Sequence, residues 1–110
     1  MEKLVQSVKA VIKEEYDRAA EKYGCVHSSD HEGFAVLLEE FEETTDEIAV
    51  LNDRIPKLWK LVKGDGSDSY KTEILKEIQD SAMLAACEAI QVAAMAYKAR
   101  LTIFNRGEAE

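Results

Sequence analysis

The stretch from Ser81 to Tyr97, SAMLAACEAIQVAAMAY, constrains this chain most strongly, because fourteen of its seventeen residues are apolar and Glu88 is its only charge. Apolar residues occupy nearly every face of a helix formed by this stretch, so we expect other helices or a second subunit to cover it. The stretch is shorter than the roughly 20 residues needed to cross a bilayer. We therefore predict a core helix and no membrane span.

Glu88 needs a compensating partner in such a helix. Moving a carboxylate into an apolar interior costs on the order of several kcal/mol, so the group is normally neutralised, paired with a cation or bound to a metal. No Lys or Arg lies within one helical turn of it. Three interpretations follow: a Lys or Arg from another helix pairs with Glu88, the helix is exposed on that side, or Glu88 binds a metal ion.

The rest of the chain also has helical patterns, with only one proline and five glycines among 110 residues. We expect residues 1–110 to form a single all-α domain, an antiparallel bundle of about four helices. A chain this short buries only a modest core, so a homodimer or homotetramer formed through the Ala-rich helix is also expected. The predicted helices span about Glu2–Tyr23, Ser29–Asn52, Ile55–Lys63 and Ser69–Phe104, with a linker at Gly64–Ser69.

The second predicted helix combines an apolar stripe with acidic residues. Ser29 and Glu32 have the spacing of a capping box, which marks the start of the helix. Glu40 and Glu43 share a strip on one flank of the stripe, whereas Glu39 falls toward the other side. The stripe itself is expected to face the core and consists of Phe34, Leu37, Leu38, Phe41, Ile48 and Leu51.

Two pairs of oxygen donors are predicted on these helices. Residues three apart lie on the same helix face, which pairs Glu40 with Glu43 and Glu88 with Gln91. Two such pairs on facing helices would offer the hard oxygen ligands that Mg²⁺ or Mn²⁺ prefers. The alternative for Glu40 and Glu43 is an acidic helix face exposed to solvent.

Charge and composition exclude other classes of function. The net charge is −8, from 22 acidic and 14 basic residues, which opposes binding to nucleic acid or to an anionic membrane. The N-terminus lacks the continuous apolar run of a signal peptide, and Cys25 and Cys87 suit a reduced pair, so we expect a cytoplasmic protein. Cys25, His27 and His31 lack an evident fourth ligand for a transition-metal site. The run GDGSDS at Gly64–Ser69 lacks the glycine and glutamate that a calcium loop requires.

The acidic residues resemble a known family. The string LEEFEE at Leu38–Glu43 is similar to the EExxE motif of the MazG-like nucleotide pyrophosphohydrolases, an all-α superfamily. The partner motif of that family is ExxD, and Glu88-Ala89-Ile90-Gln91 resembles it with Gln in place of Asp. The strings HSSDHEGFAVLLEEFEE and EAIQVAAMA further resemble a branch found in Gram-positive bacteria and their phages.

The resemblance implies hydrolysis of a nucleoside triphosphate to a monophosphate and pyrophosphate. It implies that Glu40, Glu43, Glu88 and Gln91 hold Mg²⁺ or Mn²⁺ and that Glu39 orients or deprotonates the attacking water. The neutral amide of Gln91 removes one negative charge from the site and should weaken metal affinity. The alternative is therefore a catalytically inactive helical oligomer or binding protein that retains the MazG-like fold.

Overall fold

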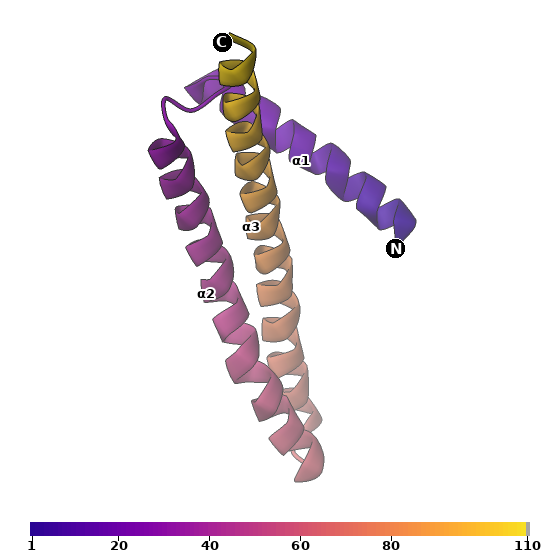
Figure 1. Cartoon of the computed structure of the whole chain (residues 1–110). Coiled ribbons are helices and arrows are strands. Elements are labelled where there is room, and N and C mark those ends of the chain that lie inside the picture. Colours follow the sequence, from indigo (N-terminus) through magenta and orange to yellow (C-terminus); the bar gives the residue numbers. More distant parts are fainter. Residues whose placement is uncertain (110) are drawn as a thin grey trace. The chain divides into compact units, whose positions relative to one another are not determined.

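The computed structural model describes residues 1–109, with side chains described through Gly107, and this range is all-α. Its three helices are α1 (Glu2–Tyr23), α2 (Asp30–Lys63) and α3 (Asp68–Ala109) (Figure 1). None of the described helices is both long enough and apolar enough to cross a membrane. The chain divides into two compact units: unit 1 contains Met1–Phe41 and the chain from Glu88 onward, and unit 2 is Glu42–Cys87.

The prediction of a separate helix at Ile55–Lys63 is wrong, because α2 continues through Pro56 to Lys63. A proline inside a helix removes one backbone hydrogen bond and crowds the preceding turn, which usually breaks or bends the helix. Here Leu51 and Leu58, on either side of Pro56, are both partly buried, and this packing keeps one helix continuous. The described residues therefore form three helices where about four were expected.

The sequence predicted most of the helix ends. The bounds of α1 are those expected, and Gly24 ends it with a positive φ of 94°. At the start of α2 the Glu32 amide donates to Ser29 Oγ at 3.1 Å, as the capping box predicts. The cap of α3 is Ser67, whose Oγ accepts the Tyr70 amide at 3.2 Å, instead of Ser69. This helix also extends beyond Phe104 to Ala109.

The core lies in unit 1, where α1, the first part of α2 and the last part of α3 pack together. The Tyr16 ring meets the Tyr97 ring edge to face, with centroids 4.8 Å apart. Its hydroxyl donates to the Cys25 carbonyl at 2.9 Å, and burial raises the pKa of Tyr16. These contacts fix the loop after α1. Tyr16, Ala94 and Met95 are buried, and around them pack Ile12, Ala19, Ala20, Val36, Leu37, Tyr97 and Leu101.

The predicted core stripe of α2 is mostly exposed. Phe34 is 64% exposed and Phe41 is 52% exposed, and Leu38 and Ile48 are also accessible. The reason is that α2 packs through a neighbouring strip, in which Val36 and Leu37 contact the core of unit 1. The other helices cover α3 only in part, because Met83 and Leu84 are exposed within the single chain. Cover of this side by a second subunit stays a prediction.

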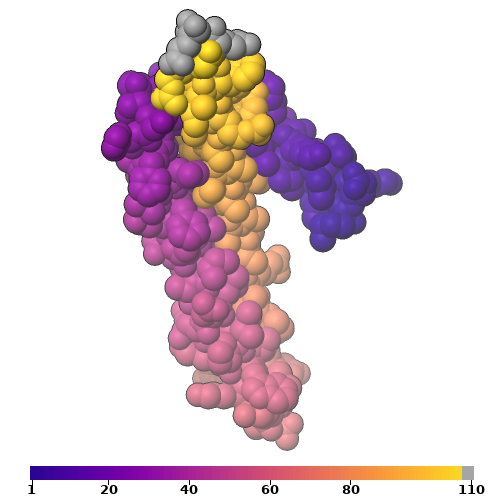
Figure 2. Space-filling model, viewed as in Figure 1, coloured from indigo at the N-terminus to yellow at the C-terminus, as the bar shows by residue number. Residues whose placement is uncertain are grey.

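Unit 2 is a helical hairpin in which the second part of α2 and the first part of α3 lie side by side (Figure 2). The turn between them is tight, because the Gly66 amide donates to the Leu61 carbonyl at 2.7 Å. A Cβ atom at Gly66 would lie only 2.7 Å from Leu61 Cδ2 and 3.2 Å from the Leu61 carbonyl oxygen, so a larger residue there would make Leu61 shift. Arg54 Nε donates to Glu77 Oε2 at 2.5 Å and links the two helices.

Replacing Pro56 by alanine should stabilise the protein. Alanine restores the missing backbone hydrogen bond of a continuous α2, so we expect the free energy of unfolding to rise by about 2 kcal/mol. Urea unfolding followed by circular dichroism measures this change. The control Lys60→Ala, on the same helix, should stay within about 0.5 kcal/mol of the parent. A loss of stability in Pro56→Ala would contradict a continuous helix.

Candidate metal centre

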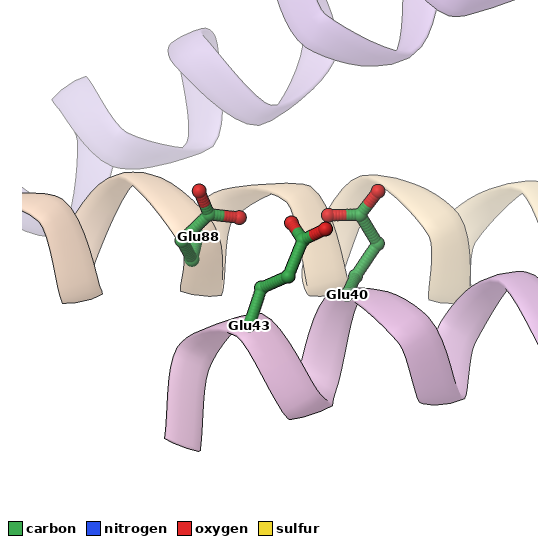
Figure 3. A group of neighbouring side chains, drawn as sticks. All are labelled: Glu40, Glu43 and Glu88. Atoms are coloured by element: carbon green, nitrogen blue, oxygen red, sulfur yellow. The ribbon is translucent and has the colours of Figure 1, made fainter. Parts of the chain in front are cut away.

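Three glutamates from α2 and α3 form the carboxylate cluster: Glu40, Glu43 and Glu88. One carboxylate oxygen of each lies within 4.8 Å of the others, and the three side chains converge from the two helices (Figure 3). Glu40 and Glu88 both belong to unit 1. Glu43 follows Glu40 by one turn of the uninterrupted helix α2, which sets their spacing.

The cluster provides hard oxygen donors in a setting that suits a cation. Glu40 and Glu88 are partly buried and Glu43 is exposed. Each of Glu40 and Glu88 also has a polar or ionic interaction within the chain. Because like charges this close repel one another, a divalent cation among the three oxygens would relieve the repulsion. The donor set therefore fits Mg²⁺ or Mn²⁺, which prefer carboxylate oxygen.

Glu88 is partly buried in the described chain, so the helix is partly open on that side, as one of the interpretations of the sequence allowed. The neighbouring turns of α3 show why: Leu84 on the preceding turn is exposed, whereas Gln91 on the following turn is partly buried in unit 1. Glu88 thus lies at the edge of the packed core. A carboxylate at such an edge keeps contact with solvent, so its ionised form costs less than in a closed interior.

A cleft of about 550 Å³ in unit 1, here called the polar cleft, contains the other predicted site residues. Glu39 and Gln91 line it together with Glu40, so the structure brings the proposed water-positioning carboxylate and the amide to one cavity. Glu39 is exposed and Gln91 is partly buried. The complete lining is Ala19, Tyr23, His27, Glu32, Val36, Glu39, Glu40, Gln91, Met95 and Lys98.

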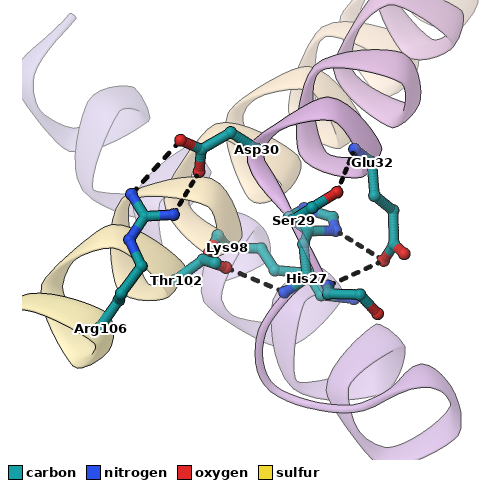
Figure 4. Close-up of polar contacts among 8 residues, drawn as sticks. His27, Ser29, Asp30, Glu32, Lys98, Thr102 and Arg106 are labelled. Atoms are coloured by element: carbon teal, nitrogen blue, oxygen red, sulfur yellow. Dashed lines mark hydrogen bonds and ion pairs between the residues drawn. The ribbon is translucent and has the colours of Figure 1, made fainter. Parts of the chain in front are cut away.

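His27 is the buried end of the loop between α1 and α2 and is fixed by its backbone. Its amide donates to Thr102 Oγ1 at 2.9 Å, and that hydroxyl donates to the Lys98 carbonyl at 2.8 Å (Figure 4). The imidazole side chain is only 2% exposed. Glu32 Oε1 lies 3.5 Å from Nδ1 but outside hydrogen-bonding geometry, so neither ring nitrogen has a hydrogen-bond partner.

The Glu32 carboxylate is held in its charged form at the start of α2. The backbone amide of Ser28 donates to it and is the main reason that the pKa of Glu32 lies below its ordinary value. The nearby His27 imidazole lowers the same pKa further.

A second polar contact lies close by. Arg106 donates two hydrogen bonds to Asp30 and so joins the start of α2 to the last part of α3 within unit 1.

Sequence reasoning missed His27 and Lys98 as lining residues of the polar cleft. Lys98 lies seven residues after Gln91, and that spacing places both on one face of α3, which was a usable signal. No local pattern predicts the burial of His27, because a long-range hydrogen bond to Thr102 creates it. The alternative set of Cys25, His27 and His31 does not converge into a metal-ligand group among the described residues. Both cysteines are free and exposed.

Comparisons with protein families, with curated proteins and with solved structures gave no match for this chain. The geometry of the carboxylate cluster and of the polar cleft is therefore the basis for any functional conclusion.

Replacing Glu32 by glutamine should lower the melting temperature at pH 7. A carboxylate whose pKa is lowered by folding stabilises the protein above its unfolded pKa of about 4.3. That contribution disappears as the pH falls through the folded value, so the difference between parent and variant should shrink below about pH 4. Thermal melts between pH 7 and pH 3 measure it, with Glu21→Gln on α1 as the control. A pH-independent difference would contradict this interpretation.

Proposed function

We propose that this protein is a Mg²⁺- or Mn²⁺-dependent nucleoside triphosphate pyrophosphohydrolase of the MazG-like type. The observation that supports the proposal is the carboxylate cluster, whose member Glu40 also lines the polar cleft of about 550 Å³. The EExxE string at Glu39–Glu43 and the ExxQ string at Glu88–Gln91 agree with it. A cytoplasmic location, where nucleoside triphosphates are abundant, belongs to the same proposal.

Different residues would bind the metal ion and activate the attacking water. Glu40, Glu43 and Glu88 would hold the metal, and Gln91 would add its amide oxygen from the cleft wall. The bound ion would neutralise phosphate charge and stabilise the charge that develops during displacement. Glu39 would accept the proton of a water molecule that attacks the α-phosphorus. The bond from that phosphorus to the bridging oxygen then breaks, giving a nucleoside monophosphate and pyrophosphate.

Replacing Glu40 by glutamine should reduce kcat/KM by at least on the order of 100-fold, since changes even in the partners of metal ligands cost 10–100-fold. The assay measures pyrophosphate release from each common ribo- and deoxyribonucleoside triphosphate with Mg²⁺ or Mn²⁺. Adding a chelator to the parent protein should abolish release.

Glu42→Gln is the matched control, because Glu42 is an exposed carboxylate of the same helix that lines neither the cleft nor the cluster. Its activity should match that of the parent. If the parent protein releases no pyrophosphate from any nucleotide with either metal, the enzyme proposal fails. The inactive helical oligomer would then be the better description, and Gln91 would be the feature that explains the lost activity.

We further propose that the protein assembles as a homodimer, or as a homotetramer of such dimers, through α2. The sequence pointed to the Ala-rich helix, whereas among the described side chains the longest row of exposed apolar residues lies on α2. The row alternates spacings of four and three residues, with Thr45 and Asn52 completing it, which is the pattern of a coiled-coil stripe. Its exposed apolar members are Phe34, Leu38, Phe41, Ile48, Ile55, Trp59 and Val62.

The charges along α2 favour an antiparallel second copy. Residues 30–47 contain eight acidic residues and no Lys or Arg, whereas residues 53–63 contain four basic residues and one acidic residue. An antiparallel pair of α2 helices brings each acidic half beside a basic half, and such complementarity fixes orientation. Ile48 is equidistant from Phe34 and Val62, so it would meet its own copy at the two-fold axis.

Replacing Ile48 by glutamate should convert the assembly into monomers, because two added carboxylates would meet at the axis. Size-exclusion chromatography with light scattering measures the mass, and circular dichroism checks that the helices remain. Leu4→Glu, at an exposed leucine of α1, is the control and should leave the mass unchanged. A monomeric parent protein at micromolar concentration would refute the assembly.

A further inference from the structure

We propose that His27 and Lys98 form an anion-binding end of the polar cleft, which takes a phosphate group of a metal-bound polyphosphate. This inference rests on the proposed function for the identity of the ligand. The observations that support it do not depend on that function, because they concern the deep burial of both residues in the wall of the polar cleft. Lys98 is 5% exposed, and the His27 side chain is 2% exposed.

The burial of His27 is the main observation. Its two ring nitrogens are the only buried side-chain nitrogen or oxygen atoms in the described part of the chain that lack a hydrogen-bond partner. Leaving such a group unsatisfied costs about 1–3 kcal/mol, and native structures usually have a reason for it. The ring lines the polar cleft beside the Glu32 carboxylate, so a ligand with acceptor oxygens can satisfy it where a small shift of the cleft wall uncovers a ring nitrogen.

Lys98 provides the charge that an anion needs. It is the only Lys or Arg in the lining of the polar cleft. Most of the Lys98 side chain is buried, and a bound anion would compensate the charge of its ammonium group at the cleft. Side chains on a helix lean toward its N-terminus, so Lys98 leans along α3 toward Gln91. The backbones of these two residues are about 10 Å apart along the helix axis, at a rise of about 1.5 Å per residue.

The cleft is therefore polarised along α3. Glu40 and Gln91 lie toward the carboxylate cluster, and His27 and Lys98 lie toward the loop before α2. A cation suits the first end, whereas at the second end His27 and Lys98 offer donors to an anion beside the Glu32 carboxylate. A metal-bound diphosphate or triphosphate carries both charges in one molecule, whereas a simple carboxylic acid or a neutral sugar does not. The shared ligand chemistry is a phosphate group, either of a nucleotide or of free pyrophosphate.

Histidine imidazole NMR of the full chain tests the proposal without a variant. The protein, with ¹⁵N-labelled histidine and Mg²⁺, is titrated with methylenediphosphonate, a stable analogue of pyrophosphate, and separately with a nucleoside monophosphate. We expect the His27 ring nitrogens to shift in at least one titration, while the exposed His31 serves as an internal control and stays unchanged. The arm that shifts His27 identifies the source of the phosphate. No shift in either arm, or equal shifts of both histidines, overturns the proposal.

Matched variants test the charge. Lys98→Met should weaken binding of methylenediphosphonate by at least tenfold in calorimetry, and Lys98→Arg should restore most of it. Lys9→Met removes the same charge from the exposed surface of α1 and should bind as the parent does. Circular dichroism melts verify that each variant is folded. Unchanged affinity in a folded Lys98→Met variant overturns the proposal, and the NMR titration decides if that variant does not fold.

The two proposals can fail separately. If no nucleotide is hydrolysed but methylenediphosphonate shifts His27, the anion-binding end stands and the enzymatic function falls. If pyrophosphate is released but Lys98→Met leaves KM and the diphosphonate affinity unchanged, the enzymatic function stands and the anion-binding end falls.

Discussion

The burial of Ala94 in unit 1 is the contact on which the rest of this site depends. Ala94 is completely inaccessible, and Tyr16 and Met95 form the buried cluster around it. A side chain this small lets a neighbouring helix approach closely. With that contact made, the rotation of α3 about its own axis is fixed within unit 1. The same rotation places Gln91 and Lys98 in the wall of the polar cleft.

The polar cleft and the core of unit 1 share some of the same residues. Met95 and Val36 belong both to the apolar packing of unit 1 and to the cleft wall, so the core directly supports the polar residues beside them. Buried polar groups cost stability unless they are partnered, and His27 is not. Its position is maintained by backbone bonds, through Thr102 and through the Tyr16 contact to Cys25. Backbone contacts therefore fix the position of the His27 imidazole, although its ring nitrogens make no hydrogen bonds.

Small size explains why so much apolar surface is left over. The three helices of the described residues enclose a small core, to which each helix contributes one side. The row of exposed apolar side chains from Phe34 to Val62 along α2 is the main part of this uncovered surface. Among the described residues of unit 1, α2 packs through Val36 and Leu37 and leaves Phe34 and Phe41 more than half exposed. The proposed second copy would bury that face.

The sequence by itself determined the all-α class, the bounds of α1, the cap at Ser29 and the acidic strip of Glu40 and Glu43. These are local properties, since helical spacing, capping side chains and glycine at a positive φ act over a few residues. It also predicted Glu88 and Gln91 on one face of α3, because three residues separate them. The start of a separate helix at Pro56 was predicted wrongly, since α2 continues through this residue and packing on both sides overrode the local preference of proline.

Only the tertiary structure decided which face of each helix is covered. The apolar stripe of α2 looked like the core face, but contacts with α1 and α3 in unit 1 turned Val36 and Leu37 inward instead. The same contacts left Glu88 partly exposed and buried His27 and Lys98. The physical reason is that a helix with two apolar flanks can pack through either one, and the choice depends on partners far away in sequence.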